Sequence, residues 1–530
     1  MRMRPRPLAY HHLLALLLAF FAFTMSALVS RAVFERLPHL EDEVAYLFQA
    51  KTLAGGQLTV AIPEPRRAYW QPFVVDYDET GQRFGKYPPG WPLLLAAGVL
   101  SGQAWLVNAL FAAMTVALVY RLGRELFSPD TGAIAAALTA FSPMALLLNG
   151  TLMGHTAALW TAVLFMYALL RVERGRGALR WGALGGLALG LLVINRPLTA
   201  VGVAAPFVVY AALRLLAALR GGWRPFAQAL RPLLALAAIT LIVGAAVPLY
   251  SYAATGDPTK NLYTLVWPYD RVGFGECCGR SGHTIEKGIR HLRFDLSLMA
   301  ADLYGWQVGR ITPELQAHLR TESGYWPPLG LSWLLLPFGL LAGARRRWTW
   351  LLALSAISLM AAHLAYWIGA QRYSTRYYFE ALAALSLISA LPLAWLIARS
   401  RRRGLVYAAL ALALVYSLYA YSTPRIQALY RFNEISRETL EGVAARRDGD
   451  RPVLVLVSGP DSGDRRVRWR ALGALMAVTS PYLDSEIVGA WDTLRPGVRA
   501  AILARFPERQ VIEMRAEGNF AYFVDAPAAD

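Results

Sequence analysis

The 530-residue sequence contains only two cysteines and four lysines, and charged residues make up only 17% of it. The cysteines are the adjacent pair Cys277 and Cys278, whose spacing matches no usual zinc motif. A vicinal disulfide, a contribution to a metal site and two inert thiols all remain open. No internal repeat is evident, which argues against a repeat-built transporter. Hydrophobic residues instead reach 56% and the mean hydropathy is +0.37, so a multi-span membrane protein is predicted.

About eleven apolar runs are long enough to cross a bilayer as helices, which takes roughly 20 residues each. They cover residues 8–30, 95–122, 131–150, 155–171, 179–195, 197–219, 232–254, 327–344, 348–369, 377–398 and 404–421. The first run is long enough to span and no clear cleavage site of small residues follows it, so no cleaved signal peptide is expected. The predicted fold class is an all-α polytopic membrane protein.

The net charge of +18 would suggest nucleic-acid binding in a soluble protein, but here the arginines gather in particular loops. The clusters are Arg2/Arg4/Arg6, Arg121/Arg124, Arg171/Arg174/Arg176/Arg180, Arg220/Arg224/Arg231, Arg345/Arg346/Arg347 and Arg399/Arg401/Arg402/Arg403. With about eleven spans all of them fall on one side, which the positive-inside rule makes cytoplasmic. The N-terminus is therefore predicted in the cytoplasm, the protein in the cell membrane, and no nucleic-acid partner is expected.

The loops 31–94, 255–326 and 370–376 then lie outside, together with the tail after residue 421. Short helices are predicted over 42–54, ended by two glycines, and over 285–304. We divide the chain into a transmembrane catalytic domain, 1–421, and an extracytoplasmic domain, 422–530. The tail has apolar bursts at 453–457, 501–503, 511–512 and 520–524, a pattern typical of a small α/β domain.

Acids stand at one end of the first outside loop, and a lysine followed by prolines stands at the other. Asp42 or Glu43 could act as general base on an acceptor hydroxyl, while Lys86 and Arg196 could hold the phosphate of a leaving lipid. The alternatives are structural: Asp42 as an acid in the first turn of a helix, Lys86 among headgroups, and Arg196 reaching out from the end of a span.

Further polar residues lie at predicted outside boundaries of the spans. Arg372 and Arg376, near Glu380, could help to hold the phosphate or could be interface anchors, because charges at such places are costly unless they face a cavity or headgroups. His155 and His283 could join the first-loop acids in a metal site, although a single histidine at a span end is more often a packing residue.

Asp42-Glu43, Tyr46, Gly55-Gly56 and Lys86-Tyr87-Pro88-Pro89-Gly90 together resemble the first outside loop of GT-C superfamily membrane glycosyltransferases. The resemblance covers about residues 8–220 and is to the family 39 protein mannosyltransferase and aminoarabinose transferase branches. It implies a GT-C-like fold and transfer of a sugar from a polyprenyl-phosphate carrier to an acceptor on the outer face of the membrane.

Position by position, the resemblance implies that Asp42 is the general base, that Glu43 is the adjacent acid and that Lys86 and Arg196 contact the donor phosphate. The chain departs from the pattern at Gly85, where some relatives have a metal-binding glutamate. It departs again at Gly154-His155-Thr156, where many relatives carry an acid.

The functional hypothesis is therefore an inverting glycosyltransferase whose partners are a polyprenyl-phosphate sugar, membrane lipids, and an acceptor that is a glycan, a lipid or a protein. The leaving group is already a good one, so no cofactor is required by the chemistry, and the departures at Gly85 and His155 put a divalent metal in doubt. The alternative is a transporter or flippase of lipid-linked or anionic substrates that uses the same cations for binding. The acid-bearing first loop favours the enzyme.

Overall fold

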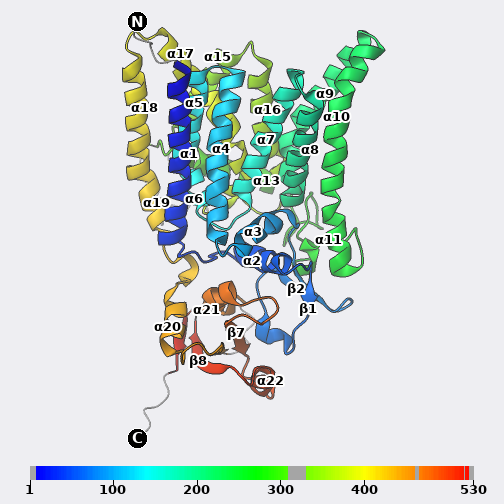
Figure 1. Ribbon diagram of the computed structural model, residues 1–530, viewed down its shortest axis with the longest axis vertical. Coiled ribbons are helices and arrows are strands. Elements are labelled where there is room, and N and C mark those ends of the chain that lie inside the picture. Colours follow the sequence, from blue (N-terminus) through cyan, green and yellow to red (C-terminus); the bar gives the residue numbers. More distant parts are fainter. Residues whose placement is uncertain (1–6, 308–329, 460–464, 519, 525–530) are drawn as a thin grey trace.

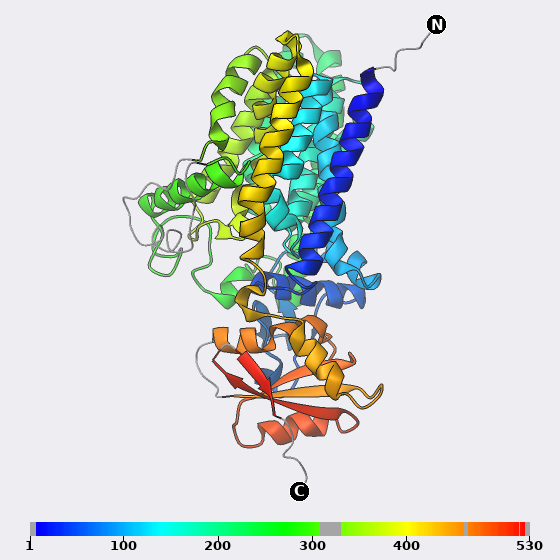
Figure 2. The same ribbon diagram turned by 90° about the vertical axis from the view of Figure 1, so that its left-hand side faces the viewer.

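The computed structural model describes residues 7–307, 330–459, 465–518 and 520–524 (Figure 1). The predicted cluster Arg2/Arg4/Arg6 and residues 308–326 of the second outside loop lie outside the described residues. A helical bundle forms one end of the molecule, and a small domain with a β-sheet forms the other (Figures 1 and 2). The first helix begins at the far end of the bundle from that domain, so the described chain ends on the opposite side from where it starts.

The bundle is built from thirteen described helices, some of them in bent or consecutive pairs. They are α1 (Pro7–Ala32), α4 (Val107–Leu126), α5 (Pro129–Phe141), α6 (Pro143–Asn149), α7 (His155–Glu173), α8 (Ala178–Asn195), α9 (Pro197–Arg220), α10 (Trp223–Gly244), α11 (Ala246–Thr255), α15 (Leu335–Gly343), α16 (Arg347–Leu364), α17 (Leu382–Arg399) and α18 (Arg403–Ser417). Their apolar residues form one large core, while α10 leaves most of its surface uncovered by protein, as a helix facing lipid does.

Within the described residues, eight helices are long and apolar enough to cross a membrane, or nine if the bent pair α5–α6 is one span. The sequence-based count of about eleven is therefore not confirmed. The two runs that account for the difference are 327–344, of which α15 covers only nine residues, and 348–369, where α16 carries Arg347 and His363 and is not among the eight. Both helices pack within the bundle, α16 against α9 and α15 against α17.

The basic loops meet at the end of the bundle where α1 begins. Arg174 and Arg171 pair with Glu125, Arg347 pairs with Glu173, and His11 on α1 lies 2.9 Å from Asp130. Among the described residues of the predicted clusters, Arg171, Arg174 and Arg347 therefore share this end.

The opposite end carries the elements of the long loops. They are α2 (Glu41–Ala54), β1 (Val60–Ala61), β2 (Val74–Tyr77), β3 (Gln82–Gly85), α3 (Gly90–Leu100), α12 (Tyr263–Val266), α13 (Ile285–Asp302), β4 (Gln371–Arg372), β5 (Ser374–Thr375) and α19 (Thr423–Gln427). Helical turns of other pitch are η1 (Arg66–Tyr69), η2 (Ala104–Leu106), η3 (Ser332–Leu334), η4 (Arg376–Ala381), η5 (Leu418–Ser422) and η6 (Phe432–Glu434). The helices predicted over 42–54 and 285–304 are confirmed as α2 and α13. Gly56, at φ 78°, supplies the left-handed turn after α2.

The C-terminal region holds a mixed sheet of order β7-β6-β8-β9 with its own apolar core. The strands are β6 (Val453–Ser458), β7 (Ile487–Asp492), β8 (Gln510–Glu517) and β9 (Phe520–Phe523), and the helices are α20 (Glu438–Arg446), α21 (Arg465–Val478) and α22 (Val498–Arg505). The central β6 pairs in parallel with both neighbours and is buried, which explains its unbroken apolar sequence. The burst at 501–503 lies on α22 and is not a strand, and β7 carried no comparable burst.

This sheet domain docks on α2. Lys51 donates to the carbonyls of Ala477 and Thr479 over 2.6 and 3.0 Å, and Tyr482 donates to the carbonyl of Thr52 over 2.9 Å. The helix that carries Asp42 is thus held from the bundle side and from the C-terminal side.

Candidate active site

A cavity of about 890 Å³ lies at the end of the bundle next to α2. Its walls come from α2, from the segment around Lys86 and from the turns that precede α7 and α9. Helix α13 and the β4–β5 hairpin complete them. Six of the nine predicted site residues line it: Asp42, Lys86, His155, Arg196, Arg372 and Arg376. Glu43, His283 and Glu380 do not line it.

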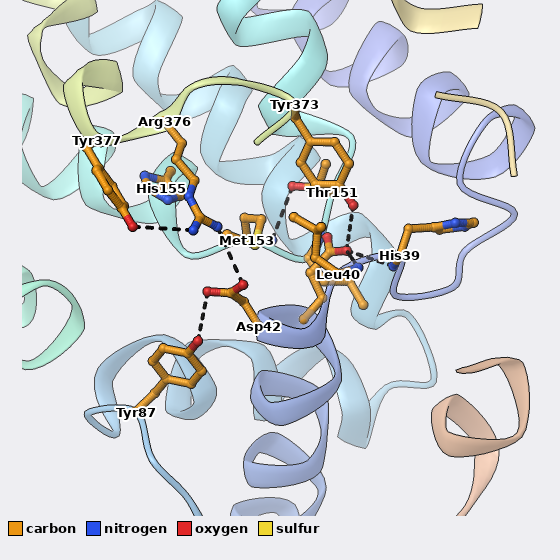
Figure 3. Close-up of polar contacts among 12 residues, drawn as sticks. His39, Leu40, Asp42, Tyr87, Thr151, Met153, His155, Tyr373, Arg376 and Tyr377 are labelled. Atoms are coloured by element: carbon orange, nitrogen blue, oxygen red, sulfur yellow. Dashed lines mark hydrogen bonds and ion pairs between the residues drawn. The ribbon is translucent and has the colours of Figure 1, made fainter. Parts of the chain in front are cut away.

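Asp42 lies in the first turn of α2 and faces the cavity (Figure 3). Tyr87 Oη donates to its Oδ1 over 2.7 Å, and Arg376 Nη1 lies 3.6 Å from its Oδ2. Burial by itself raises the pKa of Asp42, but Arg376, the Tyr87 hydroxyl and Lys86 together hold it below the usual range of an aspartate. The carboxylate is therefore ionised at neutral pH.

Lys86 lies in an aromatic cage with one counter-ion. Its ammonium is 3.2 Å from Asp270 Oδ2, and the two side chains are only 3% and 1% exposed. It lies over the rings of Phe73 at 4.1 Å, Trp267 at 4.6 Å, Tyr263 at 5.1 Å and Tyr87 at 5.3 Å. Burial lowers the pKa of Lys86, and Asp270 and Asp42 partly offset that effect. Cation–π contacts and the ion pair keep the buried ammonium stable.

Arg196, His155 and Glu380 form a cluster at the start of α7 and α9. Arg196 Nη1 lies 3.1 Å from His155 Nε2, and its Nε lies 3.3 Å from Glu380 Oε1. Glu380 is also 3.4 Å from His155 Nδ1 and is buried behind both. Arg196 therefore reaches the cavity with a carboxylate already beside it.

Glu43 points away from the cavity and holds the backbone around it. Its Oε2 accepts from the amides of His39 and Leu40 over 2.8 and 3.0 Å and from Tyr373 Oη over 2.8 Å, while its Oε1 accepts from the Leu152 amide over 2.7 Å. Burial raises the pKa of Glu43 to about 7, even though these hydrogen bonds lower it. This arrangement ties α2 to the turn before α7 and to the β4–β5 hairpin.

The β4–β5 hairpin and the first residue of η4 carry the last two predicted cations, Arg372 and Arg376. Arg376 is buried against Asp42 and Tyr377, whereas Arg372 is exposed and lines the cavity. His283 is buried elsewhere: its Nε2 is 2.9 Å from the carbonyl oxygen of Leu364, and its ring stacks on Phe274. The nearby Cys277 and Cys278 are free thiols with sulfur atoms 2.8 Å apart.

Sequence reasoning missed several cavity residues. Tyr87 was noted only as part of the motif that begins at Lys86, although it donates to Asp42, and Asp270 was not singled out, although it pairs with Lys86. Arg290 and Arg293 of α13 also line the cavity. The amphipathic pattern of 285–304 pointed to a helix but gave no sign of which groups it faces.

The residues around Asp42 do not fit a divalent cation. One carboxylate oxygen accepts from Tyr87 and the other faces the guanidinium of Arg376, which would repel a metal. At Gly85, where some relatives have an acid, an added Cβ would collide with the Gln49 side chain. Among the residues that the structure describes, no three His, Cys, Asp or Glu side chains gather as metal ligands do.

The structure thus combines a polytopic helical bundle with a charged cavity at one end, which elements of the long loops cover. Residues 92–250 match the family described as dolichyl-phosphate-mannose-protein mannosyltransferase. The fold and this match together support a likeness to glycosyltransferases of the GT-C superfamily. Comparison with curated proteins gave no match.

Solved structures support the fold. ArnT from Cupriavidus metallidurans in the apo state has 13% sequence identity and a TM-score of 0.54, over 94% of this chain and 92% of that one. The structure of the same protein bound to undecaprenyl phosphate has 14% sequence identity and a TM-score of 0.53, over 94% of this chain and 89% of that one. The oligosaccharyltransferase AglB from Archaeoglobus fulgidus, in complex with an inhibitory peptide and a dolichol-phosphate, is also similar, at 14% identity and a TM-score of 0.48. That match covers 86% of this chain, which spans 63% of AglB.

Proposed function

We propose that this glycosyltransferase moves a sugar from a polyprenyl-phosphate donor to an acceptor hydroxyl on the extracytoplasmic face of the cell membrane. The observation that carries the proposal is the single cavity in which the ionised Asp42 meets Lys86, Arg196, Arg372 and Arg376. A reaction that removes a proton on one side and releases a phosphate on the other needs a base and cations next to each other. The acceptor is a glycan, a lipid or a protein.

In this mechanism Asp42 takes the proton of the acceptor hydroxyl as its oxygen attacks the anomeric carbon. The carbon–oxygen bond to the polyprenyl phosphate breaks in the same displacement, which inverts the anomeric configuration. The negative charge of the leaving phosphate is stabilised by Lys86, Arg196, Arg372 and Arg376. No metal is required, because these side chains supply the positive charge.

The electrostatics of Asp42 suit this order of events. Arg376 holds the carboxylate ionised but also weakens it as a base, since a low pKa reduces proton affinity. A donor phosphate attracts Arg376 more strongly than a lone carboxylate does. Binding of the donor therefore shifts Arg376 away from Asp42, and the carboxylate becomes a stronger base when the donor is present.

Orientation follows from the positions of the charges. The arginine-rich end, where α1 begins, is cytoplasmic by the positive-inside rule, and the end with the cavity and the C-terminal sheet is extracytoplasmic. A donor carried by a polyprenyl chain would then meet its acceptor on the outer side. The α/β tail lies on that side, next to α2.

The test is sugar transfer by purified Asp42→Asn protein, with a polyprenyl-phosphate sugar as donor and membrane extract as the acceptor source. Loss of a general base costs about 100- to 10,000-fold in rate, so transfer should nearly vanish while folding and donor binding persist. Asp76→Asn, which alters an acid outside the cavity, is the matched control. Transfer by Asp42→Asn at the wild-type rate would remove the proposed base.

The same assay separates the proposal from its rivals. A transporter or flippase would move lipid-linked substrate across vesicles and form no sugar-transfer product. A metal requirement would appear as loss of transfer on chelation and recovery with a divalent cation, whereas the proposed mechanism predicts unchanged transfer after chelation.

A further inference from the structure

The β4–β5 hairpin is short and strained at its turn, yet it carries Arg372 and leads directly into Arg376, and both are cations of the cavity. The Arg376 amide donates to the carbonyl of Ala370 over 3.0 Å and closes the loop, and Tyr373 at the turn has φ 63°, which favours glycine. Two residues per strand give it few hydrogen bonds of its own. Something outside the hairpin must therefore fix its position.

Two buried carboxylates of α13 make these outside contacts. Asp295 accepts from the Ala370 amide over 3.0 Å, from the Gln371 side chain, and from Tyr378 Oη over 3.4 Å. Asp302 accepts from Ser374 Oγ over 2.7 Å. The two acids are seven residues apart, almost two helical turns, so they lie on the same face of α13.

Asp302 also joins the hairpin to the helix that leads to the C-terminal domain. Tyr421 Oη donates to its Oδ1 over 2.5 Å, and Arg425 Nη2 lies 3.0 Å from its Oδ2. Arg425 is in turn 3.4 Å from the carbonyl oxygen of Tyr373. The hairpin is therefore attached to the rest of the structure on both of its strands.

Burying a carboxylate is costly unless its oxygens are fully used. Asp295 uses both of its oxygens on the hairpin and the residues that flank it, whereas Asp302 divides its oxygens between Ser374 of the hairpin and the side chains of Tyr421 and Arg425. Neither acid lines the cavity, so neither touches substrate. We infer that Asp295 and Asp302 are positioning residues for the transfer reaction: by fixing the β4–β5 hairpin to α13, they set where Arg372 and Arg376 stand relative to Asp42. This inference rests on the proposed function.

The first test measures the hairpin directly and needs no sugar transfer. Amide hydrogen exchange of the peptide covering residues 370–378 is compared in wild-type, Asp295→Asn and Asp302→Asn protein. Loss of a charge-assisted hydrogen bond should speed exchange there by about tenfold. Glu125→Gln is the matched control, because Glu125 also accepts from Tyr167, Arg171 and Arg174 but lies at the opposite end of the bundle. In the Glu125→Gln protein, the amides of residues 370–378 should exchange at the wild-type rate.

The second test asks whether the acids act through Arg376. Arg376→Lys is combined with each Asn variant and with Glu125→Gln, and kcat for transfer is measured. Misplacement of a catalytic group by about 1 Å costs on the order of 100-fold. Arg376→Lys should therefore cost about tenfold less in the Asp295→Asn and Asp302→Asn backgrounds than in wild type, because the guanidinium is already displaced. In the Glu125→Gln background its cost should be unchanged.

Unchanged exchange in the hairpin, or an Arg376→Lys cost that is the same in every background, would overturn the inference. Where an Asn variant fails to fold, Ser374→Ala and Tyr378→Phe remove the hairpin side of the same contacts and are measured in its place. Wild-type protein that transfers no sugar would contradict the proposed function, and the exchange experiment would still decide the positioning role.

Discussion

Substitution of Glu43 by glutamine tests how the fold holds the first turn of α2. The carboxylate accepts four hydrogen bonds, three at Oε2 and one at Oε1. Glutamine offers one oxygen. In its better orientation it keeps the three partners of Oε2 and turns an amide N–H toward the Leu152 N–H. A buried donor left without an acceptor costs about 1–3 kcal/mol, so Glu43→Gln should destabilise the protein by about that much.

The pH dependence of this loss has a definite sign. Because burial raises the pKa of Glu43 from 4.5 to about 7, the folded state binds the proton more tightly than the unfolded state does. Stability from this group is complete below pH 4.5 and falls by about 3 kcal/mol as pH rises through 7. Glu43→Gln removes this dependence. The gap in stability between wild type and the variant should therefore shift in favour of the wild type at pH 5 relative to pH 8.

Thermal unfolding in detergent, followed by tryptophan fluorescence between pH 5 and pH 8, measures the gap. Glu64→Gln is the control, since that carboxylate is 70% exposed and should show no comparable change. Sugar transfer should stay within about tenfold of wild type, as Glu43 does not reach the cavity. A gap that widens as pH rises would refute the reasoning.

Three further outcomes are expected. Asp270→Asn should lower the unfolding temperature, because breaking a buried pair costs about 3–5 kcal/mol. Added polyprenyl phosphate should then raise the unfolding temperature of the variant by more than it raises that of the wild type. An unfolding temperature equal to that of the wild type would contradict this expectation. Cys277→Ser with Cys278→Ser should keep most transfer activity, since neither thiol lines the cavity, and loss of transfer by well-folded protein would reveal a role for the thiols. Of two reporters fused after Ser422, the one that is active only outside the cytoplasm should give a signal. A signal from a reporter that is active only in the cytoplasm would reverse the proposed orientation.

Much of the site was predictable because it lies beside apolar runs. The flanks of spans that pack together end at the same membrane surface, so Asp42, Lys86 and Arg196 could be expected near one another, and the structure places all three in one cavity. The adjacent acids separate for a simple reason: successive residues of a helix point about 100° apart. Helix geometry alone did not say which of Asp42 and Glu43 faces inward.

The partners of these residues were not predictable, because they come from distant segments with no local signature. Asp270 pairs with Lys86 across 184 positions, and Tyr373 meets Glu43 across 330. The count of about eleven spans was not confirmed, because hydropathy reports the composition of a run such as 348–369 and not how far its helix extends, and α16 ends at Leu364. The burst at 501–503 did not by itself identify an element, because three apolar residues suit the buried side of a short helix as well as a strand.

Three cations of the cavity already have a carboxylate beside them: Arg376 has Asp42, Lys86 has Asp270, and Arg196 has Glu380. Such pairing lets a membrane-surface cavity hold several buried charges without a substrate. Under the proposed function it also makes donor binding an exchange of partners, because each cation that turns to the phosphate leaves its carboxylate behind. Lys86 and Arg196 would leave Asp270 and Glu380 behind, and neither of these carboxylates is the proposed base. Arg376 would leave Asp42, which is the proposed base, so binding of the donor phosphate would also activate Asp42.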